Sequence, residues 1–512
     1  MIAEAIDLLE ESAAPVGSAL SDRPGPIRET AQAPSIAILG IPFDNVTKAQ
    51  TVATIEEMVA SRLPHYLATA NVDFLLQARR DLELRRILLE AHLVLCDGTP
   101  LVWSSRLLGN PLPERVAGSD LVPLLIRIAE KKQYRVFFLG GSPEVALAAV
   151  TNLNAQHPKL IIAGHFSPPF SPLHEMDHDQ IKQRIRAAKP DLLFVSFGCP
   201  KQEKWISMHY RSLGVPVSVG VGATIDFLAG KVKRAPKWMQ RTGCEWVFRA
   251  AQEPRRLLGR YLKGLWWFSG AIARQWWRMQ LMDGKKKTMP PTTPGQGQLT
   301  WKTVRLPARL DIETVRRDTL LCEQALATSR QCFLDLSRVE FMDSTGIGLL
   351  IRLQKKARVT GQQLILVSPS KAVLSSLNMM RLREFFTIAR DFSEAQRILK
   401  NTAETNPVLL QKNYFPSKAA LFWRGEVTAA NADQVWEMTQ AHIASRAKTK
   451  DPLQIDLSSL DFIDSTGAEL MLRARKNAIQ HGLKLHFVGT RTNVKSVLRL
   501  SKLESLVLGT EQ

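Results

Sequence analysis

The chain contains 512 residues, of which 45% are hydrophobic and 23% are charged, a balance that excludes global disorder and predicts about three domains. The formal net charge is +20, and none of the five cysteines stands in a spacing typical of a zinc site or a disulfide framework. No window of about 18 uncharged apolar residues occurs, so we expect no helix that spans a membrane.

The first half of the chain alternates short apolar runs with amphipathic helical patterns. Residues 1–35 are expected to form a loosely ordered tail, and the alternation begins after it. It predicts an α/β fold with a largely parallel, Rossmann-like sheet over 36–240, followed by a helical basic appendage over 241–283. A helical pattern covers residues 75–91. The predicted strands lie at 36–41, 65–71, 91–97, 134–141, 159–164, 191–198 and 215–222.

Four polar motifs stand where predicted strands end and loops begin. They are TAN at 69–71, CDGTP at 96–100, PERVAGSD at 113–120 and FGCPKQEKW at 197–205. Ligands of parallel α/β sheets bind beyond the carboxyl ends of the strands. We therefore expect these four motifs to converge on one site.

Asp97 is the candidate with the clearest chemistry in these motifs. A carboxylate at a strand end beside a glycine can accept a proton from an attacking hydroxyl group. The alternative is that the Asp-Gly pair only forms a turn or caps the next helix. No motif indicates a metal that binds a diphosphate, and no Walker lysine is present, so neither a metal nor another cofactor is expected.

A basic and tryptophan-rich segment covers residues 231–287, with 15 Lys and Arg residues against three acidic ones and six of the 11 tryptophans. Nucleic acid, a membrane surface or a charged substrate would each suit it. Helical spacing groups the basic residues Arg256, Arg260, Lys263, Arg274 and Arg278 beside an apolar face made by Leu258, Leu262, Leu265, Ile272, Trp276 and Met279. This pattern favours an interfacial helix at an anionic membrane, the alternative being a helix packed on its own domain.

Two similar domains are predicted beyond the linker at 284–298. The sequence LDLSRVEFMDSTGIGLL at 334–350 matches IDLSSLDFIDSTGAELM at 455–471. Each copy passes from an apolar strand through Asp-Ser-Thr-Gly into a helix. This repeat predicts small α/β domains at 299–402 and 403–512.

The first domain resembles the WecG/TagA/CpsF glycosyltransferases. The motifs ATANVDFLLQARRD, LVLCDGTPLVWSSRLLGNPLPERVAGSDL, VFFLGGSPE, PDLLFVSFGCPKQEKW, GVGATIDFLAG and RAPKWMQRTGCEWVFRAAQEPRRLLGRYL occur in the family's order and cover nearly all of 36–262. The resemblance implies an inverting, metal-independent transferase that moves an N-acetylmannosamine-type sugar from a UDP donor to a polyprenyl-diphosphate-linked saccharide. Such enzymes make bacterial surface polysaccharides, at the cytoplasmic face of the plasma membrane.

Residue roles follow from the same resemblance. Asp97 matches the family's proposed general base. The substrate-binding residues that it implies are Thr69 and Asn71 near the sugar, Arg115 and Gln202 at the donor or leaving diphosphate, and Arg249 and Arg256 in the appendage. An arginine suits a diphosphate because its planar fork matches two phosphate oxygens. We expect the part of the appendage beyond Tyr261 to contact the membrane. No nucleic acid is expected as a partner.

The duplicated Asp-Ser-Thr-Gly motif resembles STAS domains, the fold of anti-sigma-factor antagonists. In that family the serine after the aspartate is phosphorylated, which here implies Ser344 and Ser465 and a kinase or protein partner. The alternative is that these residues cap helices in permanent docking modules. Two functions therefore stay open: a regulated glycosyltransferase, or a partner-switching regulator whose transferase-like half is not catalytic.

Overall fold

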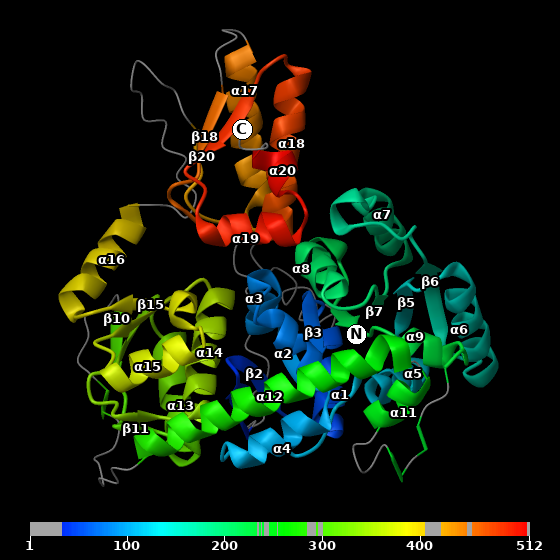
Figure 1. Cartoon of the computed structure of the whole chain (residues 1–512), viewed down its shortest axis with the longest axis horizontal. Coiled ribbons are helices and arrows are strands. Elements are labelled where there is room, and N and C mark those ends of the chain that lie inside the picture. The colour runs from blue at the N-terminus through cyan, green and yellow to red at the C-terminus, as the bar shows by residue number, and fades with distance from the viewer. Residues whose placement is uncertain are drawn as a thin grey trace, which may run out of the picture. The chain divides into compact units, whose positions relative to one another are not determined.

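The computed structural model describes residues 33–232, 235–236, 238–239, 245–252, 254–283, 293–294, 301–404, 421–447 and 453–508 (Figure 1). Most of the tail predicted at 1–35 and of the linker predicted at 284–298 therefore lies outside the described residues. The exceptions are residues 33–35, which begin a strand, and residues 293–294, which form a short strand. No described helix combines the length and hydropathy that crossing a membrane requires.

Six described strands form one parallel sheet in the transferase-like half, in the order β4-β3-β8-β7-β5-β6. This confirms the predicted α/β fold with a parallel sheet. The strands are β3 (His65–Ala70), β4 (Leu93–Cys96), β5 (Arg135–Gly140), β6 (Ile161–Phe166), β7 (Leu192–Ser196) and β8 (Val217–Gly220). The central strands are apolar throughout because helices cover both faces of the sheet.

Alternate residues of these strands enter two separate cores. Tyr66 and Ala68 of β3 face a core that includes α2 and α8, whereas Leu67 faces the core of α5 and α6. The helices of this half are α1 (Lys48–Ser61), α2 (Val72–Ala78), α3 (Leu82–Glu90), α4 (Thr99–Leu107), α5 (Gly118–Lys132), α6 (Pro143–Gln156), α7 (His178–Ala188), α8 (Lys201–Leu213), α9 (Thr224–Leu228), α11 (Glu245–Gln252) and α12 (Pro254–Asp283).

Two predicted elements are each divided in the structure. The helical pattern at 75–91 is divided between α2 and α3, because the Asp81 carboxylate accepts a hydrogen bond from the Leu84 amide at 3.0 Å and starts a new helix. The strand predicted at 36–41 is not part of the parallel sheet. It forms β1 (Ala33–Ile38), which pairs antiparallel with β2 (Ile41–Asn45), and Leu39 and Gly40 turn the chain with positive φ angles.

The repeat forms two small α/β domains, as the sequence predicts. In the first, β15-β14-β12-β10-β9 is the strand order of the main sheet, and in the second the order is β16-β18-β20. The first domain contains β9 (Thr293–Pro294), β10 (Trp301–Arg305), β11 (Arg309–Leu310), β12 (Gln331–Asp335), β13 (Phe341–Met342), β14 (Gln363–Val367), β15 (Thr387–Ala389), α13 (Ile312–Ala327), α14 (Ser344–Val359), α15 (Lys371–Met379) and α16 (Phe392–Glu404).

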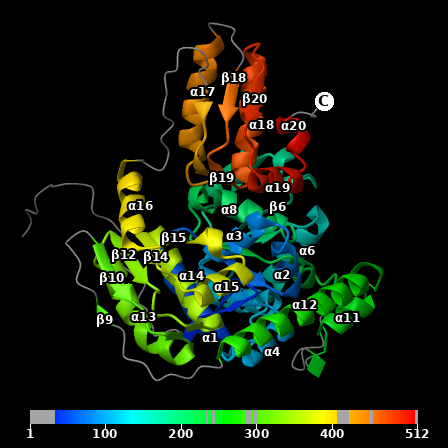
Figure 2. The same ribbon diagram turned by 60° about the vertical axis from the view of Figure 1, so that its left-hand side comes forward.

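The second domain repeats this arrangement. It contains β16 (Leu421–Phe422), β17 (Gly425–Val427), β18 (Leu453–Asp456), β19 (Leu460–Ile463), β20 (Leu485–Val488), α17 (Ala432–Ala447), α18 (Ser465–Gln480), α19 (Thr492–Leu500) and α20 (Glu504–Leu508). Figures 1 and 2 both show α17 and α18 side by side next to β18 and β20. In both domains the Asp-Ser-Thr-Gly motif lies at the start of the helix that follows a short strand, β13 or β19.

The long helix α12 corrects the predicted apolar face. Ile272 is buried and Trp276 and Met279 pack against the transferase core, so this part of the face meets protein rather than lipid. Leu262 and Leu265 remain exposed, and the side chain of Leu258 lies outside the described structure. Spacing alone did not show which part of a continuous apolar stripe the fold would cover.

Candidate active site

Asp97 lies directly after β4, at the carboxyl edge of the sheet. Its backbone N–H donates to the Ala70 carbonyl at 2.9 Å, which fixes the end of β4 beside the end of β3. The N-cap of the following helix is Gly98, and no side chain caps that helix. Asp97 is therefore not the N-cap residue of α4, and its role as general base stays a prediction.

Thr69 and Asn71 stand at the end of the neighbouring strand β3. The Thr69 hydroxyl is buried 3.5 Å from the Gly220 carbonyl, and a Cβ atom added to Gly118 would lie 3.3 Å from that hydroxyl. The Asn71 amide oxygen caps α2 by accepting from the amides of Asp73 and Phe74 at 3.0 and 3.2 Å. These contacts hold both residues rigidly at the edge that carries Asp97.

Arg115 lies among three carboxylates. Its guanidinium donates to Glu245 at 2.9 Å and to Asp120 at 3.1 Å, and Asp97 interacts with it electrostatically. Burial by itself lowers the pKa of Arg115, but Asp97, Glu245 and Asp120 together raise it above its usual value. Arg115 therefore carries a permanent positive charge next to the candidate base.

Gln202 joins the same edge from the start of α8, where it is buried. Its amide oxygen accepts from the backbone N–H groups of Gly198 and Gly222 at 3.1 Å each, and its amide nitrogen donates to Glu203 at 2.7 Å. These bonds fasten the loop after β7 to the loop after β8. In this structure Gln202 therefore shapes the edge, and its contact with the donor stays a prediction.

The arginines predicted in the appendage fall in described helices, Arg249 in α11 and Arg256 in α12. Their side chains lie outside the described part of the structure, so their roles stay predictions.

No role was predicted from the sequence for two carboxyl groups near this edge, those of Glu245 and Glu203. Glu245 connects α11 of the appendage to Arg115 at the sheet edge, and burial raises the pKa of Glu203 to about 7. The signal for Glu245 was its place in the matched motif GCEW, where it is one of only three acidic residues in a strongly basic segment. Such an isolated acid is expected to have a basic partner elsewhere in the fold.

The two serines of the repeated motif begin helices α14 and α18, and both are buried. The preceding aspartates are the caps. Asp343 accepts from the amides of Thr345 and Gly346, and Asp464 accepts from the amide of Gly467. Neither serine therefore acts as the N-cap of its helix, so its hydroxyl is available for another contact.

A parallel sheet with polar residues gathered at its carboxyl edge is typical of the α/β domains that bind ligands at that edge. Comparisons with known proteins identify the family of this domain. Residues 36–281 match the model of the glycosyl transferase WecG/TagA/CpsF family. Residues 291–395 match the STAS domain, and residues 416–508 match the model described as Mlab, STAS domain. The chain belongs to the WecG/TagA/CpsF family of glycosyltransferases, and two STAS domains follow its transferase domain.

Curated relatives agree with this assignment. Two proteins of Staphylococcus aureus, from strains MW2 and NCTC 8325, are each 32% identical over 233 residues, which cover 45% of this chain and 90% of theirs. Both are named N-acetylglucosaminyldiphosphoundecaprenol N-acetyl-beta-D-mannosaminyltransferase.

Among solved structures, a putative anti-sigma factor antagonist from Thermotoga maritima is 24% identical, with a TM-score of 0.20 and coverage of 21% of this chain and 94% of that one. The Bacillus cell fate determinant SpoIIAA in its phosphorylated form is 19% identical, with a TM-score of 0.19 and coverage of 21% and 98%.

Proposed function

We propose that the transferase domain moves an N-acetylmannosamine-type sugar from a UDP donor to a polyprenyl-diphosphate-linked saccharide, in the synthesis of a bacterial surface polysaccharide. The names of the Staphylococcus aureus relatives support the sugar and the lipid-diphosphate acceptor. The observation that carries the mechanism is the position of Asp97 beside the charged Arg115 at the carboxyl edge of the sheet.

In this mechanism Asp97 is the general base. Its carboxylate takes the proton of the acceptor hydroxyl while that oxygen forms a bond to the anomeric carbon of the donor sugar. The bond between that carbon and the diphosphate oxygen breaks, UDP leaves, and the anomeric configuration inverts. Arg115 stabilises the charge that develops on the diphosphate, because its guanidinium is fixed in place and stays charged.

The remaining residues bind and orient the substrates. Thr69 and Asn71 stand on the strand next to Asp97 and are assigned to the sugar, while Gln202 holds the loops around it. Arg249 and Arg256 are assigned to the donor diphosphate. The ion pair between Glu245 and Arg115 would couple closure of the appendage to the position of Arg115.

The test is turnover of UDP-N-acetylmannosamine with N-acetylglucosamine-diphosphate-polyprenol, read as UDP release and as lipid-linked product. Asp97→Asn should lower kcat by roughly 10²–10⁴-fold, the contribution typical of general base catalysis. Asp179→Asn, which changes an almost fully exposed carboxylate on α7, is the matched control and should behave as wild type. Equal activity of wild type and Asp97→Asn would remove the proposed mechanism. Inertness of both with every donor tried would favour the non-catalytic regulator.

We also propose that the enzyme binds the anionic surface of the cytoplasmic membrane face through α12. Its exposed side now consists of apolar residues interleaved with cations, a composition suited to the lipid headgroup region. The apolar members are Leu262, Leu265, Trp266, Trp277 and Leu281, and the cations are Lys263, Arg274 and Arg278.

Point variants test this surface better than truncation after Tyr261 does, since truncation would also remove Phe268 and Ile272 from the core. Trp266→Ala with Trp277→Ala should weaken cosedimentation with vesicles containing anionic lipid by roughly tenfold, because both indoles are exposed. Trp103→Ala, an exposed tryptophan on α4, is the matched control. Equal binding of all variants would contradict a membrane role for α12.

Finally, we propose that the two STAS domains serve as docking modules of this enzyme. Their serine-bearing helix starts are buried within the chain, which supports contact with a protein surface rather than with water.

A further inference from the structure

Helix α3 of the transferase domain buries charged residues on a side that does not face its own sheet. The carboxylate residue Glu83 is 1% exposed and Arg85 is 7% exposed. Removing such groups from water costs several kcal/mol per ion unless each charge is paired. Glu83 is compensated by Ser465 of the second STAS domain and by Lys204 of α8, and Arg85 donates to backbone carbonyls of Met380 in the first STAS domain and of the β1–β2 turn.

The Glu83 carboxylate accepts hydrogen bonds from the N-terminus of α18 in the second STAS domain. Its two oxygens accept from the backbone N–H of Ser465 at 2.5 Å and from the Ser465 hydroxyl at 2.8 Å. Lys204 forms an ion pair with the same carboxylate at 2.8 Å. A carboxylate at a helix N-terminus is favoured by the free N–H groups and the helix dipole. Glu83 thus occupies the position at which an anionic ligand of α18 would sit.

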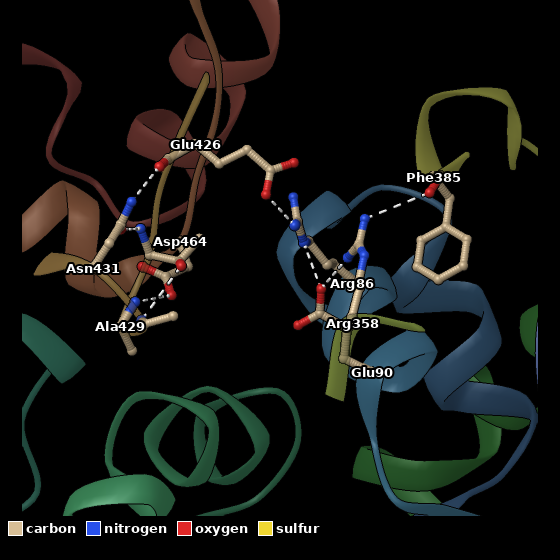
Figure 3. Close-up of polar contacts among 10 residues, drawn as sticks. Arg86, Glu90, Arg358, Phe385, Glu426, Ala429, Asn431 and Asp464 are labelled. Atoms are coloured by element: carbon tan, nitrogen blue, oxygen red, sulfur yellow. Dashed lines mark hydrogen bonds and ion pairs between the residues drawn. The ribbon is translucent and has the colours of Figure 1, made fainter. Parts of the chain in front are cut away.

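A row of alternating charges continues this interface along α3, as Figure 3 shows. Arg358 of the first STAS domain pairs with Glu90 at 2.6 Å, and Glu90 pairs with Arg86 at 2.9 Å. Arg86 in turn pairs with Glu426 of the second STAS domain. One short helix of the transferase therefore contacts both STAS domains through charges.

The second STAS domain presents Glu426 and Ser465 from one rigid surface. The Asn431 side chain donates to the Glu426 carbonyl at 2.8 Å, and Asp464 accepts from the Ala429 amide at 2.9 Å (Figure 3). These bonds join β17 to the start of α18. The two contacts with α3 therefore form or break together.

We propose that the partner of the second STAS domain is helix α3 of its own transferase domain, and that a negative charge on Ser465 releases it. This inference deepens the docking role proposed above and rests on it. A phosphoryl group would replace the hydroxyl hydrogen that Glu83 accepts and would place about two negative charges against that carboxylate. The attachment would transfer the γ-phosphoryl group of ATP to the serine oxygen, with ADP as leaving group and the hydroxyl proton released, and it requires a protein kinase.

The docked state also protects this serine, because Ser465 is only 8% exposed. A kinase can reach the hydroxyl only after the domain has left α3, and the new charge then opposes its return. Phosphorylation of Ser465 would thus make a transient release of the second STAS domain from α3 long-lived.

Hydrogen exchange of the full chain, measured by mass spectrometry without substrates, tests this directly. In Ser465→Glu, peptides of α3 and of the start of α18 should exchange roughly tenfold faster or more, since like charges facing each other oppose docking. Ser445→Glu adds the same charge to an exposed site on α17 and should match wild type. Adding Glu83→Gln to Ser465→Glu should restore part of the protection, because the repelling charge is removed.

Wild-type protection of α3 in Ser465→Glu, or an equal loss in Ser445→Glu, would overturn the inference. Protection of α17 must persist, because it reports that the second STAS domain is still folded. If α17 also loses protection, Glu426→Arg, which reverses the charge opposite Arg86, replaces the first variant. Unchanged α3 protection in that variant would equally overturn the inference. Transferase activity does not enter the measurement, so its failure would leave the proposed reaction intact.

Discussion

The two STAS domains share the motif Asp-Ser-Thr-Gly, but the serines of the two motifs contact the transferase domain through different chemistry. Ser344 of the first accepts a hydrogen bond from the neutral Gln275 side chain of α12 at 2.8 Å, whereas Ser465 of the second donates to the charged Glu83 at 2.8 Å. Ser344 is fully buried, and Gln275 also binds the backbone of Ala37 and Leu39 in the β1–β2 hairpin. The contact of Ser344 is therefore buried and neutral, whereas the contact of Ser465 involves a charged carboxylate and can be opposed by a further negative charge.

A glycine explains how the first domain comes so close. A Cβ atom added to Gly348 of α14 would lie 2.4 Å from the Ser35 carbonyl oxygen of β1. The matching position of the second domain is Glu469, so no such backbone approach is possible there. Identical motifs can therefore support a permanent interface in one copy and a releasable one in the other, depending on the residues around them.

The largest effect should come from adding a side-chain carbon at Gly348, where α14 lies close to the backbone of β1. Gly348→Ala places its methyl group against the backbone of β1. We therefore expect the free energy that holds the first STAS domain against β1 to fall by about 2 kcal/mol or more. The measurement is the thermal unfolding midpoint together with hydrogen exchange of β1. Gly270→Ala on α12, where the added atom meets nothing, is the control and should be neutral or stabilising. An unchanged midpoint in Gly348→Ala would show that the two interfaces do not differ as described.

A smaller effect is expected from salt. The Arg86–Glu426 pair is partly exposed, so raising ionic strength from about 0.05 to 0.5 M should speed exchange of α3 a few-fold. Exchange at β1 and the start of α14 should stay constant, because Gln275 and Ser344 carry no charge. Equal salt sensitivity at both interfaces would break the distinction between them.

The smallest effect concerns pH. Burial and the neighbouring Glu83 charge raise the pKa of Asp464 to about 7, well above its value in the unfolded chain. Stability from the protonated carboxyl is therefore complete below about pH 4 and is lost as pH rises through about 7. The unfolding midpoint of wild type relative to Asp464→Asn should therefore fall between about pH 4 and about pH 7 and stay constant above that range. A difference that does not vary with pH would contradict the raised pKa.

The same comparison extends to the aspartate of the first domain. Burial also raises the pKa of Asp343 to about 7, but Glu83 has no part in that shift. Glu83→Gln should therefore weaken the pH dependence that Asp464 causes and leave the one caused by Asp343 unchanged. The effect of Glu83→Gln on these two pH dependences separates the charge on α3 from burial as the cause of each pKa shift.

The local features of this protein follow from its sequence. Buried strands are recognisable because helices on both faces of a parallel sheet require continuous apolar runs, as in β4 and β7. The carboxyl ends of such strands lie at one edge, so the motifs that carry Thr69, Asn71 and Asp97 could be expected to meet there. The STAS pair was recognisable because its motif occurs twice.

Tertiary structure alone decided which surfaces these elements cover. Glu83 and Ser465 lie 382 positions apart, and Arg86 and Glu426 lie 340 apart, so no local spacing shows that they pair. On α12 the same limit appears, because the helix period reveals an apolar stripe but not which part of it another element will bury. Hydrophobic periodicity is set within each element, whereas the partners of buried charges are set by packing between elements.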